Sequence, residues 1–462
     1  MWTLRRNRDT TWTPVGRRLP TVWSMKTKTL VVATVLAGSL AGTGSASATA
    51  GPSGDFDVTG YDITMDYRPD SRNLQGVTVV SAVSAESLRS LTLALDGPRV
   101  RSVEIDSQAA RYTQSGEDLV VEPATPIGRG ARFTVRISYD GTPGAAWLPT
   151  TSGGATAFEG GSSAWFPAHE DGHDKARFHL VATVPDGWGV VSIGREGAVR
   201  HEPGATTYDW TEPAADPDFI AVSVDRFTID RSALADGTPV VNAYAPGLEA
   251  ATRPLADRLP EILGFLSGRF GPYPFDAAGN VFVDVNDDGP GTSPQTRPVY
   301  LGAGNSQYMN IQQVVHEQAH QWYGVSVAPG QAEDGCLAEC FASYATWLWD
   351  EAEGGADLDA RYREQVEAAK GDSAFWQPLY RPGQLPGLNM YSKGPLALHA
   401  LRRQIGDEAF GRLLKGWAQA HRGEYVGWPE FEAFAGRISG QDLTGFFQAW
   451  FRGATVPADG YL

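Results

Sequence analysis

Two histidines and a glutamate near the middle of the chain place the strongest constraint on its fold. The segment HEQAHQWYG spans residues 316–324, and Glu339 follows nineteen positions after His320. Residues four apart on a helix project from the same face, so His316 and His320 can bind one cation if this segment is helical. Two imidazoles leave a metal ion under-coordinated, and Glu339 on a following helical segment can complete the set. The fold must therefore bring two helices to one point.

The residues around the two histidines indicate a helix. Apolar side chains recur there at three- and four-residue spacing, and no Pro or Gly interrupts the pattern before Gly324. These side chains are Ile311, Val314, Val315, Ala319 and Trp322. With three protein ligands, zinc keeps an open position for water, which is typical of catalytic sites, and it lowers the pKa of that water to about 7. We expect one catalytic Zn²⁺ per chain, with Glu317 placed to accept the proton.

A second segment with the same histidine spacing, HEDGH at residues 169–173, predicts a loop. Its middle residues are a charge and a glycine, Pro167 precedes it, and the following FHLVATV alternates like a strand. Nineteen residues after His173 the chain has Ser192, which is not a carboxylate. We expect these histidines to be solvated or hydrogen-bonded, and binding of a second metal is the alternative.

The first fifty residues are typical of a secretory signal peptide. Basic residues precede an apolar run that starts at Leu30, and two Ala-x-Ala motifs end at Ala48 and Ala50. Met25 is an alternative start, because a complete signal follows it. The apolar run is short for a membrane span and rich in Gly and Ala. We therefore expect residues 1–50 to be removed and the protein to be secreted and extracellular.

The rest of the chain is acidic and has enough apolar residues for two domains. Hydrophobic residues make up 42% of the 462 residues, which is an ordinary globular composition. Removing residues 1–50 takes away seven Lys or Arg and one Asp, so the formal net charge moves from −16 to −22. This charge repels nucleic acid and anionic membranes, and neither is expected as a partner. The oligomeric state does not follow from the sequence.

The spacing of apolar residues divides the chain into two halves. From about residue 55 to 245 the period is two, as in the runs Tyr61 to Tyr67, Phe133 to Tyr139 and Phe178 to Val184. Helical spacing follows, with a brief return to a strand at NVFVDV. We predict an α+β fold in which an N-terminal, mostly antiparallel β domain, residues 51–246, precedes a mainly helical domain, residues 247–462.

The two cysteines of the chain, Cys336 and Cys340, lie one helical turn apart and flank Glu339. A disulfide across a single turn would strain helix geometry, so small buried thiols are the favoured interpretation. A local disulfide is the second, because export favours oxidation. Zinc ligation by a thiolate is the third.

A stretch after NVFVDV resembles the first half of a calcium-binding loop. Asp284, Asn286 and Asp288 alternate before Gly289, but the twelfth position holds Gln295 instead of a bidentate glutamate. Prolines also follow within the stretch. We expect a plain loop after a buried strand.

Four motifs together resemble the aminopeptidase N family of zinc metallopeptidases, the gluzincins. They are HEQAHQWYG, LAECFASY at the family's spacing, GPYPF at 271–275 and YSKG at 391–394. Residues 165–178, WFPAHEDGHDKARF, are similar to a segment of the family's N-terminal sheet domain, so the resemblance covers nearly all of the chain after residue 50. It implies a saddle-like β domain followed by a thermolysin-like catalytic domain.

The resemblance also implies residue roles. The zinc ligands are His316, His320 and Glu339, and Glu317 is the general base. Tyr391 is added as the residue that donates a hydrogen bond to the developing oxyanion. Asp334 falls at an acidic position before the glutamate ligand, where it can orient a ligand histidine. The expected partner is a peptide substrate, and the expected reaction is removal of N-terminal residues from short peptides.

The chain departs from the family where the substrate's amino terminus binds. Members carry a GxMEN-like strand whose glutamate holds the α-ammonium group, but here the segment is GTSPQTRPVYLG and that position falls at Ser293. A neutral hydroxyl cannot supply the charge. Glu159 lies near a second amine-anchoring position, in an alignment with a one-residue gap. The alternatives are therefore a zinc endopeptidase or dipeptide-releasing enzyme, or a zinc-containing binding protein with weakened catalysis.

Overall fold

The computed structural model describes residues 55–170, 173–285, 291–303 and 309–462. Every described residue belongs to one compact unit, Pro52–Leu462. The predicted signal peptide and the Asn286, Asp288 and Gly289 positions of the calcium-loop-like stretch lie outside the described residues. No helix among those described is long and apolar enough to cross a membrane.

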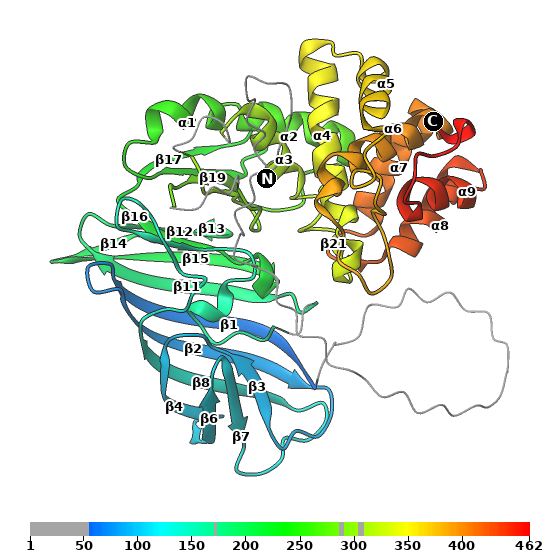
Figure 1. Ribbon diagram of the computed structural model, residues 1–462. Helices are drawn as coiled ribbons and strands as arrows, with labels where there is room; N and C mark the ends of the chain where they lie inside the picture. Colours follow the sequence, from blue (N-terminus) through cyan, green and yellow to red (C-terminus); the bar gives the residue numbers. More distant parts are fainter. Residues whose placement is uncertain (1–54, 171–172, 286–290, 304–308) are drawn as a thin grey trace, which may run out of the picture. The chain divides into compact units, whose positions relative to one another are not determined.

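A large sheet forms the N-terminal part of this unit (Figure 1). Its strands are β1 (Phe56–Arg68), β2 (Asn73–Ser84), β4 (Arg99–Ile105), β5 (Gln108–Ala109), β8 (Arg132–Gly141), β11 (Ala176–Pro185), β13 (Arg195–Glu196), β14 (Arg200–Glu202) and β15 (Ala205–Ala215). The order is β13-β15-β11-β1-β2-β8-β4-β5, with β14 on β15. β1 and β11 run parallel, and the other pairs of this sheet are antiparallel, as predicted for most of it.

Alternating apolar residues form the buried face of this sheet. Successive side chains of a strand point to opposite faces, so every second residue of β8, of β11 and of β1 from Tyr61 onward enters the core. In β1, Tyr61, Ile63, Met65 and Tyr67 are each at most 1% exposed. Ile63 lies opposite Leu180 of β11, so the buried sets of the two strands coincide. A slip of one residue would expose the whole set, which fixes the register.

Smaller sheets complete the β structure. One contains β3 (Leu91–Ala94), β6 (Arg111–Ser115) and β7 (Asp118–Glu122); another contains β9 (Leu148–Pro149), β10 (Ala155–Ala157), β12 (Gly189–Ser192) and β16 (Val222–Asp225). β21 (Ala328–Pro329) pairs with β22 (Tyr425–Val426). A fourth sheet contains β17 (Thr228–Ala233), β18 (Pro239–Tyr244), β19 (Ala278–Phe282) and β20 (Val299–Tyr300).

The fourth sheet crosses the predicted domain boundary. β18 pairs in parallel with β19, and Val240 lies opposite Ala278. Strands from both sides of residue 246 therefore share backbone hydrogen bonds. A division of the chain at that residue remains a prediction.

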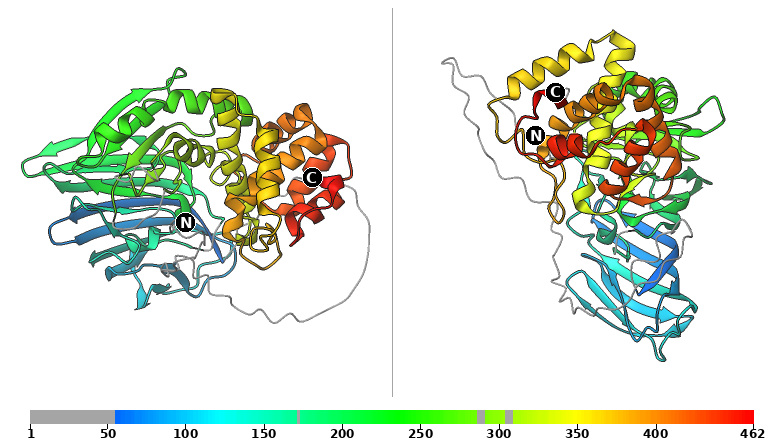
Figure 2. Two further views of the ribbon diagram at one scale, coloured as in Figure 1. Left: turned by 45° about the horizontal axis from the view of Figure 1, so that its top comes forward. Right: turned by 90° about the vertical axis from the view of Figure 1, so that its right-hand side faces the viewer.

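Two of the described helices precede residue 311, and the chain is mainly helical after it. The helices are α1 (Glu249–Ala256), α2 (Leu259–Phe270), α3 (Ile311–Ala319), α4 (Cys336–Gly354), α5 (Leu358–Ala369), α6 (Lys393–Ile405), α7 (Asp407–Ala420), α8 (Trp428–Ser439) and α9 (Thr444–Phe447). α4 contacts both α3 and α6, and α7 contacts both α6 and α8 (Figure 2). The predicted α+β fold, with a β part followed by a mainly helical part, is confirmed.

Consecutive aromatic contacts connect the residues after α3 with α4, α8 and α7. The ring of Tyr323 stacks on Phe341 with centroids 4.5 Å apart, and Phe341 meets Phe431 edge-on at 5.2 Å. Phe431 in turn meets Trp417 at 5.2 Å, and all four side chains are at most 2% exposed. Each such pair adds about 0.5–1.5 kcal/mol beyond its burial. These contacts fix α4 against the end of α3.

Candidate metal centre

Helix α3 presents His316 and His320 to one point. Asn310 caps the start of the helix, and His320 directly follows its last residue with a helical backbone. Val315 and Ala319 are fully buried, so packing sets the rotation of the helix. The Nε2 atoms of the two histidines lie 3.2 Å apart. The prediction that both imidazoles share one helical face is confirmed.

The carboxylate of Glu339 lies against both imidazoles. Glu339 is in the first turn of α4, and its Oε2 is 3.4 Å from Nε2 of each histidine. This oxygen is buried and has no hydrogen-bond partner within the part of the chain that the structure describes. Its unused lone pairs therefore face the two imidazole nitrogens. Among the described residues, this is the one group of three such side chains with metal-ligand spacing.

The three atoms have the spacing of ligands around a tetrahedral zinc ion. Zinc bonds of about 2.0–2.2 Å place two ligand atoms of a tetrahedron roughly 3.3–3.6 Å apart. The separations here are 3.2, 3.4 and 3.4 Å. Two imidazoles and one carboxylate are also a donor set that zinc accepts in catalytic sites, with one position open. The residues present therefore fit zinc.

The charges of the cluster favour a cation. Burial lowers the pKa of His320, but the carboxylates of Glu339 and Glu317 outweigh it and raise that pKa to about 9. Burial raises the pKa of Glu339, yet the two histidines bring it well below its usual range. A metal ligand must be an unprotonated imidazole, so binding of a cation here is coupled to loss of a proton.

The ring of His320 is oriented by a backbone carbonyl and not by Asp334. Its Nδ1 lies 2.9 Å from the carbonyl oxygen of Tyr323, which can only accept, so Nδ1 carries the proton and Nε2 faces the cluster. Asp334 accepts hydrogen bonds from the backbone N–H groups of Trp428 (2.8 Å) and Gln331 (3.1 Å). The predicted histidine-orienting role of Asp334 is therefore wrong. Its carboxylate instead holds the start of α8 against the turn that precedes α4.

Glu317 lies beside the histidines with both carboxylate oxygens hydrogen-bonded. Its Oε1 accepts from Nε2 of Gln313, and its Oε2 accepts from the hydroxyl of Ser293. The Ser293 hydroxyl also lies 3.2 Å from the backbone oxygen of Glu317. Glu317 is 4% exposed and Ser293 is 5% exposed. The structure thus directs the hydroxyl of Ser293, which the sequence places at a substrate-binding position, toward the predicted general base.

Tyr391 borders the cluster from the 3-10 turn Leu388–Tyr391. Its ring centroid lies 6.1 Å from that of His316, and 45% of the residue is exposed. Partial burial and the carboxylates of Glu339 and Glu317 raise the pKa of Tyr391 above its usual range. The phenol therefore keeps its proton at neutral pH and can donate a hydrogen bond.

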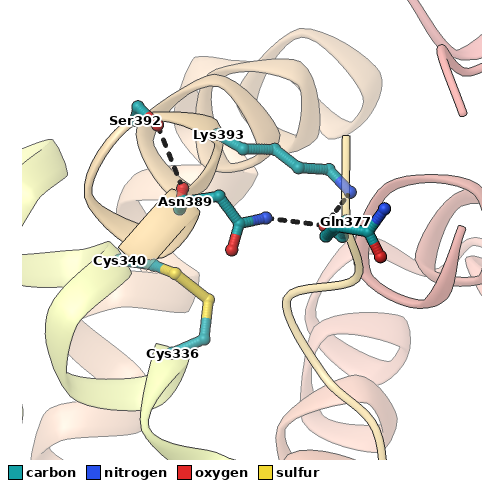
Figure 3. Close-up of a disulfide and its surroundings, with 6 residues drawn as sticks. All are labelled: Cys336, Cys340, Gln377, Asn389, Ser392 and Lys393. Atoms are coloured by element: carbon teal, nitrogen blue, oxygen red, sulfur yellow. Dashed lines mark hydrogen bonds between the residues drawn. A yellow bond between two sulfur atoms is a disulfide. The ribbon is translucent and has the colours of Figure 1, made fainter. Parts of the chain in front are cut away.

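The turn that carries Tyr391 is held by side-chain hydrogen bonds to backbone carbonyl groups. Asn389 and Lys393 both donate to the carbonyl of Gln377, at 2.6 and 3.0 Å (Figure 3). The ammonium group of Lys393 also donates to the carbonyls of Trp376 (3.2 Å) and Gly453 (3.1 Å), so each of its three protons has an acceptor. Tyr391 is therefore presented from a fixed turn.

Cys336 and Cys340 form a disulfide in the first turn of α4, on either side of Glu339 in the sequence (Figure 3). Their Cα atoms are 4.8 Å apart, within the usual disulfide range of about 4.4–6.8 Å. One turn of helix therefore accommodates the bond, and the favoured prediction of free buried thiols is wrong. The second interpretation, a local disulfide, is the one found.

Glu159 reaches the cluster from the loop after β10. Its Oε2 accepts a hydrogen bond of 2.7 Å from the hydroxyl of Thr292, the neighbour of Ser293. The side chain is half-buried. Burial raises the pKa of Glu159 despite this hydrogen bond, and the nearby carboxylates of Glu339 and Glu317 act in the same direction. The two residues predicted to lie near the substrate's amino terminus, Glu159 and Ser293, are thus close together, because Glu159 contacts the neighbour of Ser293.

Among the residues that the structure describes, the second histidine pair does not form a comparable site. His169 and His173 lie outside any helix. Nδ1 of His169 is 3.2 Å from Oδ2 of Asp174, and Nε2 of His173 is 2.5 Å from the carbonyl oxygen of Gly330. The prediction that these two histidines lie outside a helix and are hydrogen-bonded is confirmed.

Three contributors to the site were not identified from the sequence. They are the amide of Gln313, the hydroxyl of Thr292 and the backbone carbonyl of Tyr323. Gln313 precedes Glu317 by four residues, a spacing that places both on one helical face and could have indicated the contact. The contacts of Thr292 and Tyr323 depend on tertiary structure, and no local sequence pattern predicts them.

Comparison with known proteins shows a similarity to peptidases of family M1. Residues 301–450 match the peptidase family M1 domain. Aminopeptidase N of Lactococcus lactis subsp. lactis is 31% identical over 180 residues, which are 35% of this chain and 21% of that protein. Human aminopeptidase RNPEPL1 is 24% identical over 340 residues, which are 67% of this chain and 46% of that protein. The chain thus spans between a fifth and a half of the length of these curated relatives.

Solved structures match over most of the chain. The crystal structure of an M1 zinc metallopeptidase from Deinococcus radiodurans has a TM-score of 0.77 at 24% identity, covering 87% of this chain and 95% of that one. A two-domain M1 zinc metallopeptidase bound to L-tryptophan has a TM-score of 0.77 at 25% identity, covering 87% of this chain and 96% of that one.

The β part, the helical part and the histidine–glutamate cluster together define a metallopeptidase fold of the M1 class. The chain is similar to the aminopeptidase N-like family of zinc metallopeptidases, through its peptidase family M1 domain at residues 301–450 and through its fold.

Proposed function

We propose that this protein is a secreted zinc aminopeptidase that hydrolyses short peptides and holds one zinc ion per chain. The observation that carries the proposal is the spacing of three ligand atoms at 3.2 to 3.4 Å, with the carboxylate of Glu317 and the phenol of Tyr391 beside them. Peptide hydrolysis needs an activated water, a base and an oxyanion donor, and each has a candidate here.

His316, His320 and Glu339 would hold the ion. When bound, zinc acts as a Lewis acid toward the scissile carbonyl and lowers the pKa of a water molecule to about 7. Glu317 accepts the proton of the attacking water and returns it to the departing amine. A carboxylate has about four acceptor positions, and two hydrogen bonds to Glu317 leave one position free on each oxygen.

Tyr391 supplies the oxyanion donor. Its pKa is raised by partial burial and by neighbouring carboxylates, so the phenol stays protonated in the pH range where the histidines can bind metal. As the carbonyl carbon becomes tetrahedral, the hydroxyl donates to the oxygen that gains negative charge. Exposure of 45% of the residue leaves it accessible to a substrate.

Glu159 is the candidate anchor for the substrate's α-ammonium group. It is half-buried, and Thr292 fixes one of its oxygens. A bound ammonium group favours its ionised form, which burial alone disfavours. The L-tryptophan bound to a related metallopeptidase is consistent with a substrate that presents a free amino acid end.

The alternative function is internal cleavage or release of dipeptides. Ser293 is neutral, and its hydroxyl is directed at Glu317, so the amine end of a substrate meets one carboxylate from this region instead of two. A single anchor discriminates less strongly against blocked or extended substrates. A zinc-containing binding protein with weakened turnover is a third possibility, which predicts metal binding without cleavage.

Export is a separate part of the proposal. It rests on the basic residues, apolar run and Ala-x-Ala motifs of residues 1–50. Expression of the full chain in a secreting host should give protein in the medium whose N-terminus begins near Gly51. Retention of the protein in the cells with residues 1–50 intact would contradict it.

Cleavage assays distinguish the functions. A set of aminoacyl amides and the same compounds acetylated at the amine are offered to the purified protein, with and without a chelator, and with zinc restored. Chelator-sensitive cleavage of the free-amine compounds alone identifies an aminopeptidase, and cleavage of both sets identifies the alternative. Glu317→Gln is the matched control, because it keeps the shape and zinc ligands but removes the base. Stoichiometric zinc without any cleavage contradicts the enzymatic proposal.

A further inference from the structure

We propose that Ser293 and Gln313 are positioning residues that hold the carboxylate of Glu317 for its work as general base. The inference rests on the proposed function and deepens it. It also assigns Ser293 a different task from the substrate contact that its place in the sequence suggests.

The first observation is that Glu317 is held from two directions. Gln313 lies one helical turn before it on α3 and donates to Oε1, while Ser293 approaches from the segment between β19 and β20 and donates to Oε2. One donor on each oxygen fixes the plane of the carboxylate as well as its position. Hydrogen bonds to an ionised group are short and strong, and water has little access to the bond between Ser293 and Glu317, which are 5% and 4% exposed.

The second observation is that the segment carrying Ser293 is itself fastened to the helix. Gln321, four residues after Glu317, accepts from the backbone N–H of Thr296 at 2.7 Å and donates to the carbonyl of Pro294 at 3.0 Å. Gly291 also passes so close that an added Cβ would lie 3.2 Å from Oε1 of Glu317. The chain is therefore anchored to the helix directly after Ser293, which leaves Ser293 little freedom to turn toward a substrate.

The consequence for catalysis follows from geometry. A glutamate on a helix can turn about three bonds, and only orientations that direct an oxygen at the attacking water are productive. Misplacement by about 1 Å can cost roughly a hundredfold in rate. Loss of either donor should therefore lower the rate of the chemical step and leave substrate binding nearly unchanged.

Steady-state kinetics on four variants test this inference. Ser293→Ala and Gln313→Ala should each lower kcat by about tenfold with KM within about twofold of the original protein. Ser293→Thr keeps the hydroxyl and should recover most of kcat. Gln312→Ala is the matched control for Gln313, because the amide of Gln312 contacts Asp350 on the exposed side of α3, and it should leave kcat and KM unchanged.

Two further measurements separate positioning from substrate binding. In a Glu317→Ala background, adding Ser293→Ala should leave the Kd of a peptide unchanged, since Ser293 then has no carboxylate to hold. Crystal structures should show one Glu317 rotamer in the original protein and more than one in a Ser293→Ala, Gln313→Ala double variant. A raised KM with unchanged kcat, a weakened Kd, or a single undisturbed rotamer would overturn the inference.

The two proposals fail in different ways. If the original protein shows no chelator-sensitive cleavage, the proposed function fails, and the rotamer comparison still decides whether Ser293 and Gln313 hold Glu317. If the original protein cleaves peptides and both alanine variants keep its kcat, the positioning inference alone fails.

Discussion

Gly394 lies so close to Cys340 that an added Cβ would be 2.6 Å from the sulfur atom and 3.2 Å from the cysteine Cα. Gly394 belongs to α6, three residues after Tyr391, and Cys340 follows Glu339 on α4. The contact joins the turn that carries the proposed oxyanion donor to the helix that carries the proposed third metal ligand. Only a residue without a side chain allows the two helices this approach.

Gly394→Ala should therefore reduce both stability and activity. The methyl group meets backbone and a bonded sulfur, neither of which can move aside, and overpacking of this kind costs about 1–3 kcal/mol. Urea unfolding and kcat/KM measure the two effects. Gly411→Ala on α7 is the control, because an added Cβ there meets nothing within 4 Å, and alanine should stabilise that helix by about 0.5–1 kcal/mol. Equal behaviour of the two variants would contradict the contact.

The zinc content of alanine variants should distinguish the proposed ligand role of His320 from the structural role of Asp334. His320→Ala removes one of three ligands and should abolish stoichiometric zinc. Asp334→Ala should keep zinc and lose about 1–3 kcal/mol of stability, because two backbone N–H groups lose their acceptor at a position 4% exposed. Metal analysis after dialysis and thermal unfolding are the measurements. Loss of zinc from a folded Asp334→Ala protein would restore the histidine-orienting role.

Glu212 should make stability fall as the pH rises from about 4.5 to 7. Burial, followed by the charge of Asp276, raises the pKa of Glu212 to about 7. Below pH 4.5 the folded and unfolded states both bind the proton. Between the two pKa values only the folded state binds it, so stability decreases toward neutral pH.

Glu212→Gln removes this titration, so the difference in unfolding free energy between variant and original protein should rise with pH by up to about 3 kcal/mol. Urea unfolding at four pH values from 4.5 to 7.5 measures the slope. Comparing slopes removes any constant effect of the substitution on the neighbouring Arg297. A difference that does not change with pH would show that Glu212 ionises normally.

Glu159→Gln tests the amine anchor. The amide keeps the size of the side chain and can still pair with Thr292, but it cannot balance an ammonium charge. A hydrogen bond to a charged group contributes about 1.5–3 kcal/mol, so kcat/KM for free-amine substrates should fall by roughly 10- to 100-fold. Cleavage of the acetylated counterparts should not change. A parallel loss on both sets would indicate damage to the site instead of loss of an anchor.

Local patterns in the sequence predicted the centre of the site well. His316, His320 and Glu317 lie on one short helix, so their relation follows from helical periodicity alone. The alternation in β1, β8 and β11 likewise predicted which side chains enter the core, because a strand has only two faces. The position of Glu339 does not follow from helical periodicity alone, because it depends on how α4 packs against α3.

The remaining contacts depend on long-range packing. Asp334 is an acidic residue five positions before the proposed metal ligand Glu339, yet its carboxylate accepts a hydrogen bond from the backbone N–H of Trp428, which is 94 positions away. The parallel pairing of β1 with β11 joins segments separated by more than a hundred residues, and no local pattern shows it. The geometry of a helix interior disfavours a disulfide across one turn, whereas Cys336 is the first residue of α4.

The sheet that joins β17 and β18 to β19 and β20 limits how this protein can be dissected. A fragment beginning at residue 247 would lack β18 and leave the backbone groups on one side of β19 without partners. Such a fragment is expected to aggregate through that edge. A fragment that contains the helical half should instead begin before Thr228, so that the strands crossing residue 246 travel with the helices they support.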